Sequence, residues 1–108
     1  MIPLISQHRS ELDRLCRESG VRRLDLFGSA ATGNFDTTTS DLDFIVTFAD
    51  TTAGYADRYL AFAEALEAMF GRRVDLLTER AIRNPIFRRS VERTRECIYE
   101  LRSEQAAA

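Results

Sequence analysis

Hydrophobic residues recur along the chain with two alternating periods, and these periods predict its elements. Between residues 4 and 18 apolar side chains follow a spacing of three and four, which predicts an amphipathic helix. Residues 22–27, RRLDLF, predict a short strand. Residues 30–40 are rich in turn formers, so we expect a loop there.

The second half of the chain continues this alternation. Residues 41–48, DLDFIVTF, alternate strictly between apolar and other side chains, which predicts a strand with one buried face. An apolar stripe predicts a helix over residues 53–70, and RVDLLT predicts a strand over residues 73–78. Asn84-Pro85 is a typical helix start, and the apolar spacing that follows predicts a helix to about Leu101.

These elements predict an α+β fold, with a small mixed β-sheet of three or more strands and helices packed mainly on one face. The chain has 108 residues and shows no internal repeat or linker. We therefore expect residues 1–108 to form a single domain, in which residues from about 103 to 108 are a frayed tail.

The composition excludes several kinds of catalytic site. All 15 basic residues are arginine, so the chain cannot supply a P-loop lysine, a kinase lysine or a Schiff base. His8 is its only imidazole. Carboxylates acting with a metal ion therefore become the leading candidate for chemistry.

Charge and hydropathy limit the compartment and the partners. No apolar run approaches the roughly 18 to 20 residues of a membrane span, and no secretory signal is found, so we expect a cytoplasmic protein without membrane association. The net charge is −2, and the arginines of residues 83–95 interleave with glutamates. This pattern is typical of a solvated helix face, so direct nucleic-acid binding is not expected.

Three aspartates form the strongest candidate site. Asp41 and Asp43 point from the same side of one strand, where their charges repel unless a cation such as Mg²⁺ lies between them. Asp75 lies in an apolar strand and faces away from its buried neighbours. A simpler interpretation makes Asp41 a turn residue and Asp43 a solvated one.

A second motif precedes the aspartates. Gly28 and Ser29 end the strand 22–27, and two alanines that favour a helix follow them. Backbone amides at a helix start, together with the Ser29 hydroxyl, are suited to binding phosphate. Taken alone, the spacing from Gly28-Ser29 to Gly33 is also that of an ordinary turn.

The two motifs lie in the segment FGSAATGNFDTTTSDLDFIV. This segment resembles the DNA polymerase β superfamily of nucleotidyltransferases, whose signature is Gly-Ser, a loop and Asp-x-Asp. The segment GRRVDLLTERAIRNPIFRRSVERTRECIYE resembles the C-terminal half of the minimal nucleotidyltransferase (MNT) antitoxins, which pair with HEPN toxins. The resemblance extends from about Val21 to Glu100.

This resemblance implies a polymerase β-like nucleotidyltransferase fold and assigns roles to specific residues. It implies a nucleoside triphosphate as substrate, with ATP the expected donor, and two Mg²⁺ ions as cofactors. The implied catalytic and metal-binding residues are Asp41, Asp43 and Asp75, and the implied nucleotide-binding residues are Gly28, Ser29, Gly33 and Ser40.

The resemblance also implies a function. We expect a Mg²⁺-dependent enzyme that transfers AMP from ATP to a hydroxyl of a partner HEPN toxin and thereby acts as its antitoxin. Self-association of the chain into a homo-oligomer could instead complete the site. Two alternatives remain open: a non-catalytic antitoxin that inhibits its partner by binding, and, less favoured, nucleotidyl transfer to a small molecule.

Two features depart from the family pattern. Thr32 stands where an arginine usually precedes the loop glycine, and the loop over residues 30–40 is slightly longer than usual. Both lie in the segment expected to face phosphate. They bear on nucleotide affinity and rate more than on the fold.

Overall fold

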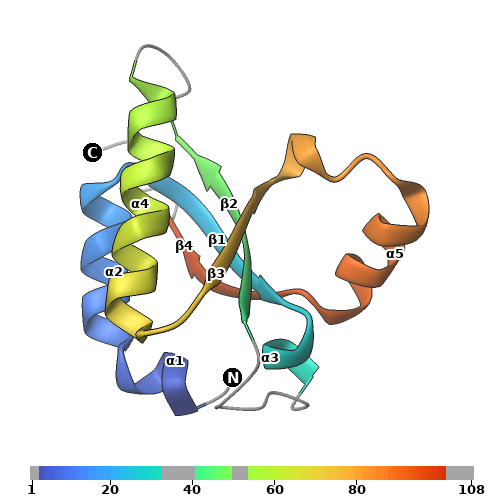
Figure 1. The fold of residues 1–108 in the computed structure, drawn as a ribbon, viewed down its shortest axis with the longest axis horizontal. Coiled ribbons are helices and arrows are strands. Elements are labelled where there is room, and N and C mark those ends of the chain that lie inside the picture. Colours follow the sequence, from blue (N-terminus) through green and yellow to red (C-terminus); the bar gives the residue numbers. More distant parts are fainter. Residues whose placement is uncertain (1–2, 33–40, 50–53, 102–108) are drawn as a thin grey trace.

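The computed structural model describes residues 3–32, 41–49 and 54–101 (Figure 1). Helices and strands alternate along these segments in an α+β arrangement, as predicted. In chain order the elements are α1 (Pro3–Gln7), α2 (Arg9–Glu18), β1 (Val21–Phe27), α3 (Ser29–Thr32), β2 (Leu42–Phe48), α4 (Tyr55–Phe70), β3 (Val74–Thr78), the 3₁₀ helix η1 (Glu79–Ala81), α5 (Pro85–Thr94) and β4 (Glu96–Glu100).

The four strands form one mixed sheet in the order β3-β2-β1-β4. β1 pairs antiparallel with both β2 and β4, whereas β2 and β3 run parallel, with α4 as their crossover connection. The predicted fold class, a small mixed sheet with helices packed mainly on one face, is confirmed.

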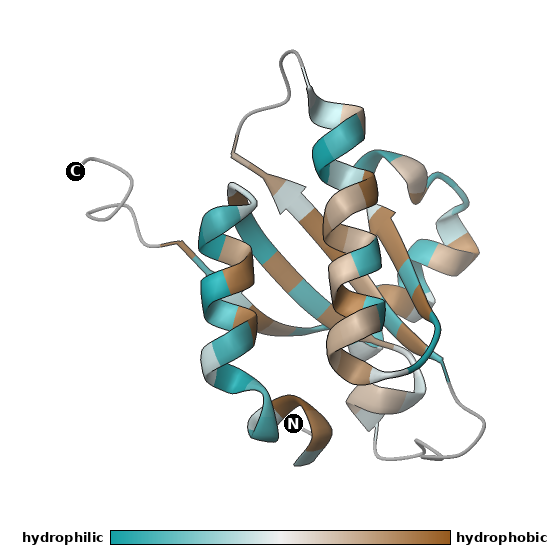
Figure 2. Ribbon diagram, turned by 60° about the vertical axis from the view of Figure 1, so that its left-hand side comes forward, coloured by the Kyte–Doolittle hydropathy of each residue, from teal (hydrophilic) through white to brown (hydrophobic). Residues whose placement is uncertain are grey.

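The main hydrophobic core lies between one face of the sheet and the helices α1, α2 and α4. Every second residue of β2 points into this core, because successive side chains of a strand point to opposite faces of the sheet. Figure 2 shows the resulting hydrophobic and hydrophilic bands along the strands. The four β2 residues in this core, Leu42, Phe44, Val46 and Phe48, are those that the sequence pattern predicts.

The opposite face of the sheet carries a second, smaller apolar cluster. Phe27 and Ile45 contribute to it from the sheet, while Ile82 and Val91 contribute from the chain that follows η1 and from α5. In Figure 1, α5 stands on the other side of the sheet from α4. This face is therefore only partly covered.

The predicted last helix, residues 84–101, is wrong in its second half. It begins at Asn84 as predicted, because the Asn84 side chain accepts hydrogen bonds from the amides of Ile86 and Phe87. It ends at Thr94, and Glu96–Glu100 form strand β4 along the edge of β1. Arg95 makes the transition, with extended backbone angles of φ −62° and ψ 139°.

Buried charges explain why the chain turns at Arg95. Asp25 of β1 is fully buried, and its carboxylate accepts hydrogen bonds from Arg23 at 2.8 Å and from Nε of Arg95 at 2.7 Å. Arg95 also pairs with Glu79 and Glu92. A buried carboxylate requires such partners, and a helix continued through residue 95 would forgo the pairing of β4 with β1.

The same network affects the acidity of Glu79. Burial alone would raise the pKa of Glu79, but hydrogen bonds and charge from Arg95 and Arg88 outweigh it and lower that pKa. Arg88 pairs in addition with Glu92, the four-residue pair expected for a solvated charged helix face. The network thus joins β1, η1 and α5, three segments distant in sequence.

Smaller differences concern the ends of elements. The first predicted helix is divided at His8 into α1 and α2, and α4 begins at Tyr55. The predicted tail, residues 103–108, lies outside the described residues. Within the described ranges, no helix is long and apolar enough to cross a membrane.

Candidate functional site

Two carboxyl groups face each other across neighbouring strands of the sheet. β2 and β3 are parallel, and their register places Asp43 directly beside Asp75. Both side chains point away from the main core, and their carboxyl groups are joined by a hydrogen bond. Because adjacent strands are only about 4.8 Å apart, this register alone brings the two acids together.

The surroundings of Asp43 disfavour its charge. Burial is the largest cause, followed by the hydrogen bond to Asp75 and by the negative charges of Asp75 and Asp41, and together these raise the pKa of Asp43 to about 6. Phe27 lies opposite Asp43 on β1, and Ile45 follows on the same face, so apolar side chains border the carboxyl group. Ionising Asp43 at neutral pH is therefore unfavourable without a cation.

Gly28 is packed against this pair of acids. It follows Phe27 at the end of β1 and has a φ of +75°, and a Cβ atom built on it would lie 2.6 Å from Oδ2 of Asp43. Its carbonyl accepts a hydrogen bond of 3.1 Å from the Ala31 amide, which begins α3. Both the conformation and the contact require glycine at this position.

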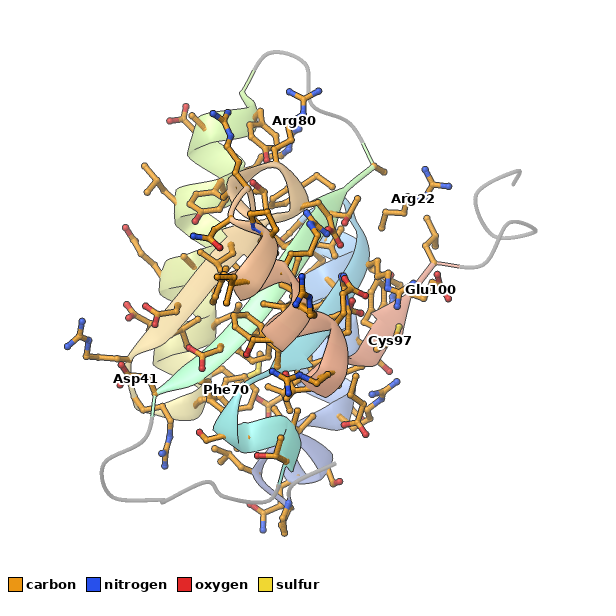
Figure 3. All side chains as sticks on the ribbon, turned by 90° about the vertical axis from the view of Figure 1, so that its right-hand side faces the viewer. Arg22, Asp41, Phe70, Arg80, Cys97 and Glu100 are labelled. Atoms are coloured by element: carbon orange, nitrogen blue, oxygen red, sulfur yellow. The ribbon has the colours of Figure 1, made fainter. Side chains whose placement is uncertain are left out.

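The structure places five of the predicted site residues. Gly28, Asp43 and Asp75 lie together, Ser29 is half-buried at the start of α3, and Asp41 is half-buried just before β2 (Figure 3). Gly33 and Ser40 lie outside the described residues.

The paired acids suit a hard divalent cation. In the described part of the chain, no three acidic, histidine or cysteine side chains gather closely enough to hold a metal ion. Mg²⁺, however, is commonly held by one or two carboxylates together with water and substrate phosphates. An acid pair in which the half-buried Asp43 has a raised pKa fits such an ion, because the cation relieves the repulsion between Asp43 and the exposed Asp75.

The sequence pattern missed two contributors to this region. The hydroxyl of Thr94 accepts a hydrogen bond from the Gly28 amide, although 66 residues separate the two. Asp25 was not singled out, yet a carboxylate between two leucines of a strand is itself a signal of a buried partner. Thr94 carried no such signal, because its spacing fitted the interior of the predicted last helix.

A cavity of about 750 Å³ lies away from these acids, where β2 and β3 end. Its walls include Thr47, Tyr59, Leu76 and Thr78, and none of the five placed site residues lines it. In Figure 3, Arg80, which lines the cavity, lies near the top of the molecule, and Asp41 lies at its lower left side. The paired acids, where titratable groups converge, are therefore the candidate site, and the cavity is not.

Comparisons with known proteins identify the family of this chain. Residues 8–99 match the nucleotidyltransferase domain family. A predicted protein adenylyltransferase of Methanocaldococcus jannaschii is 39% identical over 72 residues, which cover 67% of this chain and 71% of that protein.

Solved structures share the fold. A protein assigned as a minimal nucleotidyltransferase is 31% identical, with a TM-score of 0.70 over 88% of this chain and 95% of its own. A chain from the complex of a tri-AMPylated HEPN toxin of Shewanella oneidensis with an MNT antitoxin is 18% identical, with a TM-score of 0.60 over 94% of this chain and 77% of its own. At that identity the likeness shows the fold alone.

The contact between Gly28 and Asp43 leads to a matched pair of substitutions. Gly20→Ala places a side chain at φ +73° with nothing within 4 Å, so we expect it to cost only the conformational strain of about 1 kcal/mol. Gly28→Ala adds the clash with Asp43, and we expect its cost to exceed that of Gly20→Ala by at least about 1 kcal/mol. Urea unfolding measures the free energy of unfolding of both variants. Equal losses of stability would contradict the close contact between Gly28 and Asp43.

The raised pKa of Asp43 predicts a pH-dependent stability in the presence of a chelator. The folded state holds this proton more tightly than the unfolded chain, so the contribution is complete below the ordinary value of 3.8 and is lost as pH rises through about 6. After allowance for screening, we expect Asp43→Asn to exceed the wild type in unfolding free energy by about 1 kcal/mol at pH 8. At pH 4 the difference should nearly vanish; a difference independent of pH contradicts the prediction.

Proposed function

The chain belongs to the nucleotidyltransferase domain family, and we propose that it transfers AMP from ATP to a hydroxyl group of a partner HEPN toxin, acting as its antitoxin. The observation that carries this proposal is the Asp43–Asp75 pair with Gly28 packed against it. The identity to a predicted protein adenylyltransferase supports AMP as the transferred group. The shared fold of the MNT antitoxin bound to an AMPylated toxin supports a HEPN acceptor.

The metal ion belongs to the same proposal. Asp43 and Asp75 would hold Mg²⁺, with Asp41 as the third carboxylate that the family resemblance implies and with two ions expected when the nucleotide is bound. Bound there, Mg²⁺ would supply positive charge that neutralises the triphosphate and the departing pyrophosphate. The apolar neighbours Phe27 and Ile45 keep water from the buried side of Asp43.

The chain's own groups bind the nucleotide and move the proton. Gly28 lets the triphosphate approach the backbone, and the Ser29 hydroxyl donates to a phosphate oxygen, with Gly33 and Ser40 as further nucleotide-binding residues. The acceptor oxygen bonds to the α-phosphorus while the bond to the leaving pyrophosphate breaks. Asp75, exposed on the edge strand β3, takes the proton from the acceptor hydroxyl.

One observation favours the alternative of inhibition by binding alone. Thr32 stands where the family pattern has arginine, and its hydroxyl donates to the carbonyl of Ser29 within α3 at 3.3 Å. A neutral hydroxyl engaged in this way binds phosphate more weakly than a guanidinium does. A non-catalytic antitoxin with the same fold is therefore the second candidate.

A labelling experiment on the co-expressed toxin–antitoxin pair tests the proposal. The purified pair is incubated with Mg²⁺ and α-labelled ATP, and label is followed on a denaturing gel. We expect Mg²⁺-dependent label on the toxin, reduced at least about a hundredfold by Asp43→Asn, because losing a metal ligand removes several kcal/mol of charge stabilisation. Asp57→Asn, at an exposed position of α4, serves as the matched control and should label normally.

Toxin neutralisation in cells separates the two candidates. If Asp43→Asn abolishes both label and neutralisation while the complex still forms, inhibition by binding alone is excluded. If Asp43→Asn still neutralises the toxin, transfer is not the mechanism. Absence of label with the wild type contradicts AMP transfer to this partner.

A further inference from the structure

Thr94 ends α5 and makes one contact far from its own helix. Its Oγ1 atom accepts a hydrogen bond of 3.2 Å from the Gly28 amide at the end of β1. The same hydroxyl lies 3.3 Å from the carbonyl oxygens of Ser90 and Val91. The hydroxyl proton therefore points back into α5, which leaves an oxygen lone pair directed at Gly28.

Gly28 is where the parts of the candidate site meet. Its Cα is close enough to Asp43 that a Cβ would clash with the carboxylate, and its carbonyl binds the Ala31 amide that begins α3. Ser29 follows it directly. Any shift of Gly28 thus changes the separation between Ser29 and Asp43.

The end of α5 is itself fixed to the same strand. Arg95 follows Thr94 and binds the fully buried carboxylate of Asp25 on β1, while Val91 is buried against the sheet. Thr94 is therefore held between two anchored neighbours. Its hydroxyl therefore gives the Gly28 amide an acceptor at a fixed position, in addition to its contacts within the last turn of α5.

We propose that Thr94 is a positioning residue, which holds Gly28 so that Ser29 and Asp43 keep the separation needed to bind the metal–triphosphate group. This inference rests on the proposed nucleotidyl transfer for its kinetic test. Thr94 touches neither substrate nor metal in this role; it acts through the Gly28 amide. A threonine that served only to end α5 would affect stability but not nucleotide binding.

Two substitutions at this position and one nearby provide the test. Thr94→Val keeps the shape but removes the acceptor, Thr94→Ser keeps the acceptor, and Ser90→Ala removes an exposed hydroxyl from the same helix as a control. Steady-state transfer gives KM for ATP and kcat, and unfolding gives stability. Calorimetry with Mg²⁺ and a non-hydrolysable ATP analogue gives a Kd that does not depend on turnover.

We expect Thr94→Val to raise KM for ATP and the Kd of the analogue about tenfold, the usual effect of leaving a donor unpaired, with kcat changed by less than about threefold. Thr94→Ser and Ser90→Ala should stay within about twofold of the wild type. A Thr94→Val protein that unfolds more easily but binds the analogue normally overturns the inference, and so does a Thr94→Ser protein as weak as Thr94→Val.

The proposed function and this inference can fail separately. If the wild type transfers AMP while Thr94→Val binds and reacts as the wild type does, only the role of Thr94 is wrong. If the wild type binds the analogue but transfers nothing, the proposed transfer fails, and the Kd values still decide the role of Thr94. If the wild type binds no nucleotide, both are overturned.

Discussion

The register between β1, β2 and β3 is the constraint on which the site depends. Pairing of Phe27 with Asp43 places Gly28 directly beside the Asp43 carboxylate, and pairing of Asp43 with Asp75 brings the second acid to the same place. A slip of one residue between β2 and β3 would turn one acid into the hydrophobic core. Core packing through Leu42 and Phe44 therefore fixes the position of the candidate site as well as the fold.

Two features of the candidate site lower the stability of the fold, and interactions elsewhere in the molecule offset them. Asp43 is ionised at neutral pH only at a cost, and Gly28 adopts a conformation that other residues avoid. On the same face, however, Asp25 is fully buried and satisfied by Arg23 and Arg95. Asp25 is thus paired with arginines inside the fold, whereas Asp43 faces a second carboxylate, a division expected where function limits stability.

Local patterns in the sequence predicted most of the fold. The alternation in residues 41–48 correctly assigned β2 and its buried face. The two alanines after Gly28-Ser29 correctly indicated a helix start, but the loop predicted from residue 30 is wrong over its first residues, because α3 extends to Thr32. β4 was missed because the spacing of Val91, Thr94 and Ile98 also fits a helix. A non-local contact, between Arg95 and the buried Asp25, decides against that helix. Thr94 was missed for the same reason, because its partner lies 66 residues away.

The most direct test of the proposed transfer site is to locate the divalent cation that the protein binds. Mn²⁺ replaces Mg²⁺ in oxygen sites and broadens the NMR signals of nearby amides, so trace Mn²⁺ added with a non-hydrolysable ATP analogue locates the ion. If the acid pair holds the metal, we expect selective broadening of the amide signals of Gly28, Asp43 and Asp75. This broadening should disappear in Asp43→Asn, and the signals of α2 should be unaffected. Broadening centred on other carboxylates, or unchanged by Asp43→Asn, would contradict a nucleotidyl-transfer site at this pair.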